Sequence, residues 1–173
     1  MHRAFLTTIV CLASLSSVSA MADAQRLTGK DPSGDVPAPV ALDTRGQFQD
    51  KFSSVGDDVF ISGQPSEEAL RDLARQGVKT VVNLRTPPEM ATRVPFDERA
   101  LVTQLGMNYV YLPMRGNVEY PYSHDDLKNF ARAMTETKGK LLLHCTVAWR
   151  ASHMWAAYPV SYTHLTLPTI CSV

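Results

Sequence analysis

The residues of this sequence with the clearest capacity for chemistry lie between His144 and Arg150. Cys145 directly follows an apolar run, and four residues separate it from Arg150. A cysteine thiolate is a strong nucleophile. An arginine guanidinium can hold two oxygens of a tetrahedral oxyanion at once, which a lysine cannot do. The combination suits covalent transfer of an anionic group through a cysteine intermediate.

The surrounding pattern places these residues at a junction between a strand and a helix. Lys140–His144 has the apolar character of a buried strand, and a helix is expected to open at Arg150. Ligands of α/β sheets bind beyond the carboxyl ends of the strands, where this loop would lie. Backbone N–H groups that enter a helix N-terminus favour an anion, and the same field stabilises a thiolate. The residues expected to bind the anion are Thr146, Val147, Ala148, Trp149 and Arg150.

Four other side chains have candidate supporting roles. His144 would orient the loop through hydrogen bonds rather than act as a base. Ser152 would either hydrogen-bond to Cys145 or cap the first turn of the helix. Arg85, at the end of an earlier strand, is either a second anion contact or half of a surface ion pair. Trp149 would line the mouth of the pocket.

Strands and helices are expected to alternate along the rest of the chain. Apolar and β-branched runs predict strands over 59–62, 79–84, 107–114 and 140–144, and amphipathic stretches predict helices over 66–77, 95–105 and 123–139. Thr86–Pro88 is expected to be a turn. Such alternation is typical of βα units, so the predicted fold class is α/β, with a mainly parallel central sheet flanked by helices.

The composition excludes several classes of protein. The chain has 173 residues, of which 45% are apolar and 20% charged, as is typical of a single globular domain. Seventeen basic residues balance seventeen acidic ones, so no net charge indicates a nucleic-acid or anionic-lipid partner. The five histidines are scattered without the spacing of metal ligands, and we expect neither a metal nor a cofactor.

The N-terminal residues are expected to be a secretory signal peptide. A short basic start precedes an apolar run that is too short to span a bilayer, and small residues offer cleavage sites after Ala20 or Ala24. We therefore expect residues 1–20 to be removed and the protein to be periplasmic or secreted, with no membrane span left. Residues 21–50 are expected to form a flexible leader before a domain over 51–159.

Residues 160–173 are expected not to be native. Written in codons, Val160–Thr169 is similar to the reverse complement of a transposon-based sequencing adapter, and Pro159 is expected to end the preceding helix. The native chain would then continue beyond about Tyr158, and the domain would be truncated on its C-terminal side. Without both ends, Cys145 is the single cysteine, which is either a buried thiol or a reactive one.

The His-Cys pair followed by Arg resembles the cysteine-dependent protein phosphatases. The resemblance is greatest to the bacterial group similar to dual-specificity phosphatases, including the phosphatase-like domain fused to β-lactamase-like hydrolases. The stretches that carry it are Ile61–Pro65, Val81–Arg85, Tyr109–Pro113, His144–Cys145 and Arg150–Ser152, within about residues 55–158. The resemblance implies a hydrolase that needs no metal, in which Cys145 attacks phosphorus to form a phosphocysteine. It also implies a phosphorylated protein or small molecule as substrate.

Three features differ from the main type of these phosphatases. Five residues usually separate the cysteine from the arginine, whereas this chain has four, a length nearer to that of rhodaneses. Ala148 stands where the family usually has glycine, and a positive φ there would strain the loop by about 1 kcal/mol or more. The loop that usually supplies an Asp general acid contains Glu119 as the nearest candidate, with Asp125 and Asp126 expected to be helix N-terminal charges.

The sequence leaves three functions open. The first is a phosphatase that cleaves a phosphomonoester through a phosphocysteine, and the stretches around the loop favour it. The second is a rhodanese-like sulfurtransferase with a persulfide on Cys145, which the loop length favours. The third is an anion-binding module that has lost catalysis, which Ala148 and the missing Asp favour.

Overall fold

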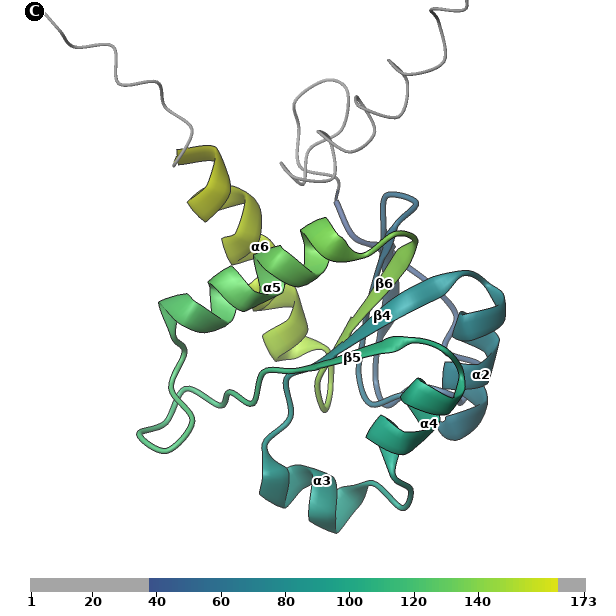
Figure 1. Ribbon diagram of the computed structural model, residues 1–173. Helices are drawn as coiled ribbons and strands as arrows, with labels where there is room; N and C mark the ends of the chain where they lie inside the picture. Colours follow the sequence, from purple (N-terminus) through teal and green to yellow (C-terminus); the bar gives the residue numbers. More distant parts are fainter. Residues whose placement is uncertain (1–37, 165–173) are drawn as a thin grey trace, which may run out of the picture.

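The structure, a computed structural model, describes residues 38–164, with side chains as far as Pro159. A single mixed sheet forms its centre, and helices cover both faces (Figure 1). The strands are β1 (Val40–Ala41), β2 (Phe52–Val55), β3 (Val59–Ser62), β4 (Val78–Asn83), β5 (Asn108–Tyr111) and β6 (Lys140–His144). The helices are α2 (Glu67–Arg75), α3 (Pro87–Arg93), α4 (Glu98–Gln104), α5 (His124–Glu136) and α6 (Trp149–His164).

The sheet is parallel except at one edge. Its order is β1-β2-β3-β6-β4-β5, in which β3, β6, β4 and β5 run parallel while β1 and β2 pair antiparallel. The predicted α/β fold with a mainly parallel sheet is confirmed. Because β6 lies between β3 and β4, the residue after it, Cys145, is at the middle of the carboxyl edge of the sheet.

Strand β6 contributes to a hydrophobic core on each face of the sheet. Leu141 and Leu143 pack in the core that includes residues of α5 and α6, whereas Leu142 packs with residues of α2 and α4 on the other side. Figure 1 shows these helix pairs on opposite faces of the sheet. Successive side chains of a strand point to opposite faces, so a strand covered on both sides must be apolar throughout.

Two serines begin helices as the sequence predicts. The Ser66 side chain accepts a hydrogen bond from the N–H of Ala69 at the start of α2, and Ser123 accepts one from Asp126 at the start of α5. Side chains at these positions satisfy N–H groups that have no partner inside the helix. Helix α2 ends before Gly77, whose φ of +93° favours glycine.

The segment Thr86–Pro88, predicted as a turn, instead begins helix α3. Pro87 occupies the first helical position, where an N–H has no partner inside the helix in any case. The Glu89 carboxylate accepts hydrogen bonds from the N–H and the hydroxyl of Thr86, each at 2.9 Å. A Thr followed three residues later by Glu is a known start of helices, so the turn prediction was wrong for a local reason.

Helix α4 is shorter than the helix predicted over 95–105. It begins at Glu98, after Asp97, whose carboxylate accepts from the N–H of Ala100 at 2.9 Å. This start leaves Ala100, which the pattern places inward, exposed to solvent. It also buries Glu98 on the same helix as Leu101.

Both ends of the described chain extend further than predicted. Within residues 38–50, predicted as leader, β1 pairs with β2 and Phe48 is buried, with its ring stacked on Phe52 at 4.1 Å. Helix α6 continues through Pro159 to His164. The predicted signal peptide, the earlier part of the leader and residues 165–173 lie outside the described residues. Of the helices between residues 38 and 164, none is long and apolar enough to cross a membrane.

Candidate active site

Cys145 lies buried at the carboxyl edge of the sheet, where β3 holds the start of its loop. Its N–H donates to the Ser62 carbonyl at 3.2 Å, and the Thr146 carbonyl accepts from the Gln64 N–H at 3.0 Å. Gly63 permits this approach, because a β-carbon there would lie 2.8 Å from the Thr146 carbonyl oxygen. The path of the loop is therefore fixed by the neighbouring strand.

The loop enters α6 through Ala148 in the left-handed conformation. Ala148 has a φ of +67°, and its carbonyl accepts from the N–H of Ser152 at 2.9 Å and from the Ser152 hydroxyl at 3.0 Å. The Ser152 hydroxyl therefore bonds to the backbone of the first helical turn as a donor, whereas a helix cap would accept from an unpaired N–H group. The helix begins at Trp149 rather than at Arg150. A β-carbon in this conformation costs about 1–2 kcal/mol, so the strain foreseen at Ala148 is present.

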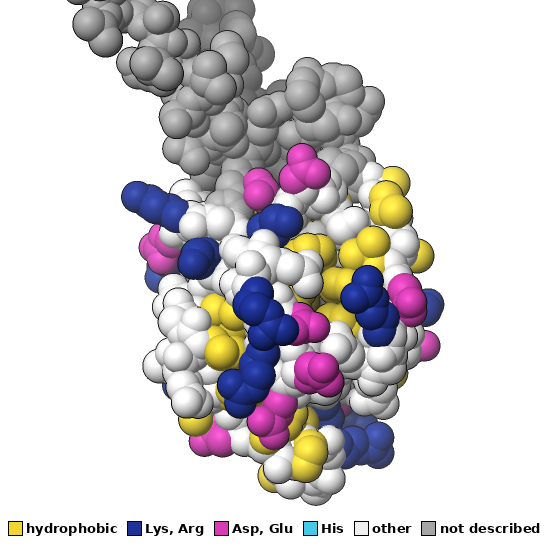
Figure 2. Space-filling model, turned by 90° about the vertical axis from the view of Figure 1, so that its right-hand side faces the viewer, with side chains coloured by type: hydrophobic (Ala, Val, Ile, Leu, Met, Phe, Trp, Pro, Cys, Tyr) yellow, Lys and Arg dark blue, Asp and Glu magenta, His cyan; other side chains and the backbone are white. Residues whose placement is uncertain are grey.

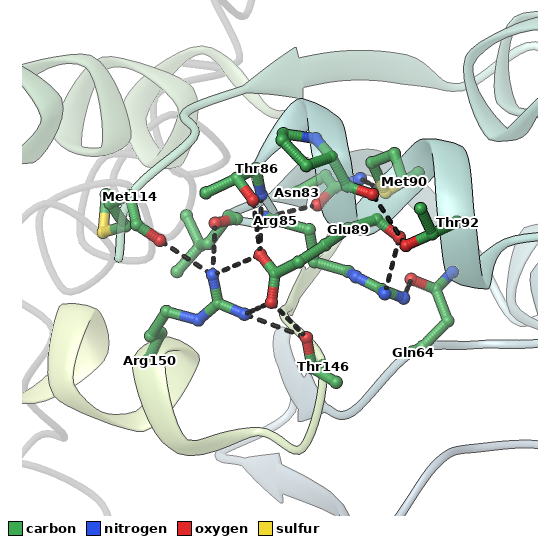
Figure 3. A network of polar contacts seen from close by, with 12 residues as sticks. Gln64, Asn83, Arg85, Thr86, Glu89, Met90, Thr92, Met114, Thr146 and Arg150 are labelled. Atoms are coloured by element: carbon green, nitrogen blue, oxygen red, sulfur yellow. Dashed lines mark hydrogen bonds and ion pairs between the residues drawn. The ribbon is translucent and has the colours of Figure 1, made fainter. Parts of the chain in front are cut away.

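Arg150 reaches across the loop to α3 and is held on several sides (Figure 3). Its Nη1 donates to Glu89 Oε2 at 3.0 Å and its Nη2 to Oε1 at 2.7 Å, which makes a bidentate pair. Nη1 also donates to the carbonyls of Met114, at 2.7 Å, and Leu84, at 3.2 Å. Nη2 donates to the Thr146 hydroxyl at 2.9 Å. Only 11% of the Arg150 side chain is exposed, so the guanidinium has one fixed position.

The environment of the Arg150 guanidinium keeps its positive charge in place. Burial acts to lower the pKa of Arg150, but the hydrogen bond to Glu89 and the negative charge of a Cys145 thiolate raise it above its ordinary value. The structure therefore brings together the nucleophile and the cation that the sequence singles out.

Glu89 is a member of this site that the sequence analysis missed. Its carboxylate accepts hydrogen bonds from Nη1 and Nη2 of Arg150, from the hydroxyl of Thr146 at 3.0 Å, and from Thr86. Burial opposes ionisation, but the hydrogen bonds from Arg150 and Thr86 lower the pKa of Glu89 to about 2. Glu89 is therefore ionised at neutral pH and balances the charge of Arg150. The pattern of Thr86 and Glu89 in the sequence indicates the start of a helix but not the contact of Glu89 with Arg150.

Arg85 is fully buried, so the prediction of a surface ion pair was wrong. Its Nη1 donates to the Gln64 side chain at 2.6 Å and its Nη2 to the Glu89 carbonyl at 3.0 Å. Its Nε has no hydrogen-bond partner within the described chain. Burial lowers the pKa of Arg85, and the nearby charges of Glu89 and Glu98 act against that shift. The guanidinium lies against the first turn of α3.

His144 is buried next to Cys145 in the sequence and is bound by Glu98, a second residue that the sequence analysis missed. His144 Nε2 lies 3.0 Å from Glu98 Oε1, and both side chains are fully buried. Asn83 Nδ2 donates to the same oxygen at 2.8 Å, and Gln64 Nε2 donates to the other oxygen at 2.5 Å. Burial opposes ionisation, but the charge of His144 and the hydrogen bonds from His144, Gln64 and Tyr109 lower the pKa of Glu98. The carboxylate accepts, so His144 carries a hydrogen on Nε2.

The loop that contains Glu119 does not bring this residue to the site. Glu119 is exposed, and the N–H groups of residues 115 and 116 both donate to the Tyr120 carbonyl at 2.8 Å. Among the described residues, no hydrogen bond or ion pair joins Glu119 to the Cys145 loop. The candidate acid is therefore on the expected loop but apart from the nucleophile.

Two apolar side chains of the Cys145 loop are exposed. Val147 is 40% exposed and Trp149 is 66% exposed, and the Trp149 ring lies edge-on to His153 with centroids 5.1 Å apart. Trp149 therefore presents an aromatic surface at the outer side of the loop.

The described residues hold no cluster of metal-ligating side chains, and one face of the surface carries both signs of charge (Figure 2). Within residues 38–164, no group of three or more His, Cys, Asp or Glu side chains could hold a metal ion. On the face drawn in Figure 2, basic and acidic side chains are interspersed with hydrophobic patches.

The parallel sheet, the buried cysteine after its central strand and the arginine that folds back over the loop define an α/β domain of the cysteine-phosphatase type. Residues 38–166 match the family described as DSP-PTPase phosphatase fused to NAD+ kinase. The match covers more than half of the chain, and the chain belongs to this family. The predicted resemblance to dual-specificity-like phosphatases is confirmed.

Individual relatives agree with this assignment. The chain is 30% identical over 107 residues to a β-lactamase hydrolase-like protein of Xylella fastidiosa strain Temecula1; the match covers 61% of this chain and 24% of that protein. A DUF442 protein of Shewanella putrefaciens CN-32, named as a candidate phosphatase, has 30% identity and a TM-score of 0.57, with 70% of this chain and 74% of that one covered. TpbA of P. aeruginosa shares the fold, with 20% identity, a TM-score of 0.52 and coverage of 70% and 68%.

Proposed function

We propose that the protein is a cysteine-dependent phosphatase that hydrolyses a phosphomonoester through a phosphocysteine on Cys145. The observation that carries the proposal is the fixed position of Arg150 beside the buried Cys145, held by Glu89, Thr146 and two backbone carbonyls. Membership of the phosphatase family supports the same chemistry. The positive charge of the guanidinium can stabilise negative charge on the phosphoryl oxygens. Because Nη1 and Nη2 already donate to these partners, a phosphoryl oxygen that binds to either of them would replace one of the present contacts.

The proposed reaction has two steps. In the first, the Cys145 thiolate attacks phosphorus while the bond between phosphorus and the ester oxygen breaks, and the leaving oxygen takes up a proton. In the second, water attacks the phosphorus and the phosphorus–sulfur bond breaks, which releases phosphate and a proton and restores the thiolate. The amides of residues 146–150 and the guanidinium of Arg150 would bind the phosphoryl oxygens throughout.

We propose Glu119 as the acid that protonates the leaving oxygen. Glu89 is nearer to Arg150, but its pKa of about 2 leaves it without a proton at neutral pH. Glu119 lies on the loop that follows β5 and is exposed, and its side chain hydrogen-bonds to that of the neighbouring Tyr120. In this proposal the loop over residues 115–122 moves toward the site when substrate binds, as active-site loops commonly do.

The test is release of phosphate from p-nitrophenyl phosphate by the purified chain and by Cys145→Ser, with Thr103→Ser, at an exposed position of α4, as the control. Serine keeps the shape of the side chain but is a much weaker nucleophile. We expect Cys145→Ser to lose activity by at least about 10³-fold while it keeps the thermal stability of the wild type. Activity that persists in Cys145→Ser contradicts the proposal.

The same protein samples distinguish the other two functions. Transfer of sulfur from thiosulfate to cyanide, without phosphate release, would identify a sulfurtransferase. Binding of orthovanadate by a folded protein that releases no phosphate would identify an anion-binding module.

We also propose that the protein is exported and acts on a phosphorylated substrate outside the cytoplasm. The support is the basic start, apolar run and small residues of the N-terminal sequence. Mass spectrometry of the protein from fractionated cells would test this, with an N-terminus after Ala20 or Ala24 in the exported fraction as the expected result. An uncleaved N-terminus in the cytoplasmic fraction contradicts it.

A further inference from the structure

We infer that Glu98 positions Arg150, and with it the anion-binding side of the loop, through a relay of buried side chains. The inference rests on the proposed function, and it concerns a carboxylate that neither step of the proposed reaction uses. The relay is a chain of hydrogen bonds that leads from Glu98 through Gln64, Arg85 and Glu89 to Arg150.

Glu98 ties together the carboxyl ends of three neighbouring strands. Its carboxylate accepts from His144 at the end of β6, from Asn83 at the end of β4, and from Gln64 just after β3, at 3.0, 2.8 and 2.5 Å. A fully buried carboxylate is stable only when its hydrogen bonds are made, so these contacts hold all three strand ends in one register. Glu98 thereby holds His144, which precedes Cys145, and Gln64, whose N–H bonds to the Thr146 carbonyl of the loop.

Glu98 also determines which way the Gln64 amide faces. The Gln64 Nε2 must donate to the carboxylate, so Oε1 faces the other way and accepts from Arg85 at 2.6 Å. The second hydrogen bond of the Arg85 guanidinium goes to the Glu89 carbonyl at 3.0 Å. With Nε of this buried arginine unpaired in the described chain, Gln64 supplies one of the few contacts that hold it.

The relay ends in the contacts drawn in Figure 3. Arg85 holds the backbone of Glu89, and the Glu89 carboxylate holds both Arg150 and the Thr146 hydroxyl. A shift in the first turn of α3 would therefore move the guanidinium and the loop together. From Arg150 the backbone leads back through Cys145 to His144, which binds Glu98, so the loop is connected to Glu98 at both of its ends.

The substitution Glu98→Gln breaks the relay at its first residue. Glutamine replaces one accepting oxygen by an NH₂ group, which cannot accept from any of the donors that converge on the site. At least one of them must lose its partner, and the Gln64 amide is then free to turn away from Arg85. Gln64→Leu breaks the relay at the next position without any change of charge.

The experiment measures orthovanadate affinity by titration of tryptophan fluorescence in the wild type, Glu98→Gln, Glu89→Gln and the double variant. The control is Glu68→Gln, which removes the same charge from an exposed position in the first turn of α2. In the wild-type background we expect Glu98→Gln to weaken vanadate binding about tenfold, or about 1.4 kcal/mol. In the Glu89→Gln background the same substitution should weaken binding by less than about twofold, because the relay to Arg150 is already broken. Gln64→Leu should match Glu98→Gln, and Glu68→Gln should match the wild type.

Equal losses in the two backgrounds would show that Glu98 only supports the fold, and would overturn the inference. The inference is also overturned if Glu98→Gln weakens vanadate binding and Gln64→Leu does not. A folded wild type that binds no vanadate contradicts the proposed function instead.

In that case hydrogen–deuterium exchange decides on the relay. Glu98→Gln should then exchange on the order of tenfold faster over residues 86–90 and 145–150, with α5 unchanged. A uniform change, or no change in those two segments, would overturn the relay.

Discussion

The two loops that meet at Arg150 are held very differently. The loop that begins at Cys145 is bonded to the end of β3 at its start and to α3 through Arg150. Over residues 115–122, by contrast, the backbone hydrogen bonds within the described chain stay inside the loop, and Val118 and Tyr122 are 101% and 56% exposed. One loop is a fixed part of the sheet edge, and the other is a surface loop.

This difference divides the proposed reaction between two kinds of structure. Stabilising the charge of a phosphoryl group requires donors that are already in place, which the Cys145 loop and Arg150 provide. Delivering a proton to a leaving group can depend on a loop that closes only over bound substrate. The anion-binding half of the site is therefore built into the fold, whereas the acid half is not.

The largest effect is expected from Arg150→Lys. A lysine keeps the charge but cannot pair with both oxygens of Glu89 or both oxygens of a phosphoryl group. We expect kcat/KM for p-nitrophenyl phosphate to fall by about 10³-fold. Arg132→Lys, at an exposed position of α5, is the matched control and should leave the rate unchanged. A loss below tenfold for Arg150→Lys would show that the fixed guanidinium is not the main stabiliser.

Glu119→Gln tests whether the exposed loop takes part at all. A general acid matters most when the leaving group is poor, so an alkyl phosphate should lose about 10²-fold in rate and p-nitrophenyl phosphate less than tenfold. Asp125→Asn is the control, because Asp125 pairs with Lys128 on the exposed start of α5. Equal losses on the two substrates would mean that Glu119 does not act as the acid.

Glu89→Gln is expected to weaken the fixed half of the site without abolishing it. The two carbonyls of Met114 and Leu84 would still hold Arg150, so we expect kcat/KM to fall about tenfold, with most of the change in KM. Glu67→Gln, an exposed glutamate in the first turn of α2, serves as control. A loss as large as that of Arg150→Lys would show that the carbonyls contribute nothing.

The same variant has a predicted pH dependence. The pKa of Glu89 is lowered from 4.5 to about 2, so its pairing stabilises the folded state fully above about pH 5 and is lost as the pH falls toward 2. The wild type should exceed Glu89→Gln in free energy of unfolding by about 1–2 kcal/mol at pH 6, and the difference should vanish near pH 2. Urea unfolding at several pH values would measure it. A difference that does not change between pH 6 and pH 2 would contradict the lowered pKa.

The elements that place Cys145 could be predicted because their signals are local. An unbroken apolar run identified β6 within its true bounds, and Ser66 and Ser123 marked the starts of two helices. Each of these signals comes from a short stretch of residues and does not depend on what packs around it. The junction between strand β6 and helix α6, where Cys145 lies, could therefore be predicted from the sequence.

Glu89 and Glu98 could not be found in this way, because both follow the pattern of ordinary helix N-terminal charges. An acidic residue in the first turn of a helix is normally explained by the helix dipole and faces water. Their burial depends on how α3 and α4 lie against the strand ends, where Arg85, Arg150 and His144 supply the partners. Such an arrangement is visible only in the folded chain.

At Ala148 the backbone conformation agrees with what the sequence suggests. Its replacement is expected to have the smallest effect of the variants considered. The expectation of a positive φ came from the position of a glycine in related phosphatases, and the structure has φ +67° there. Ala148→Gly should therefore stabilise the protein by about 1 kcal/mol, since the relief of strain exceeds the greater flexibility of glycine in the unfolded chain. The expected rise in Tm is roughly 3–6 °C by differential scanning calorimetry. Ala133→Gly, in the middle of α5, should lower Tm instead, and a fall in both variants would show that the Cys145 loop carries no strain.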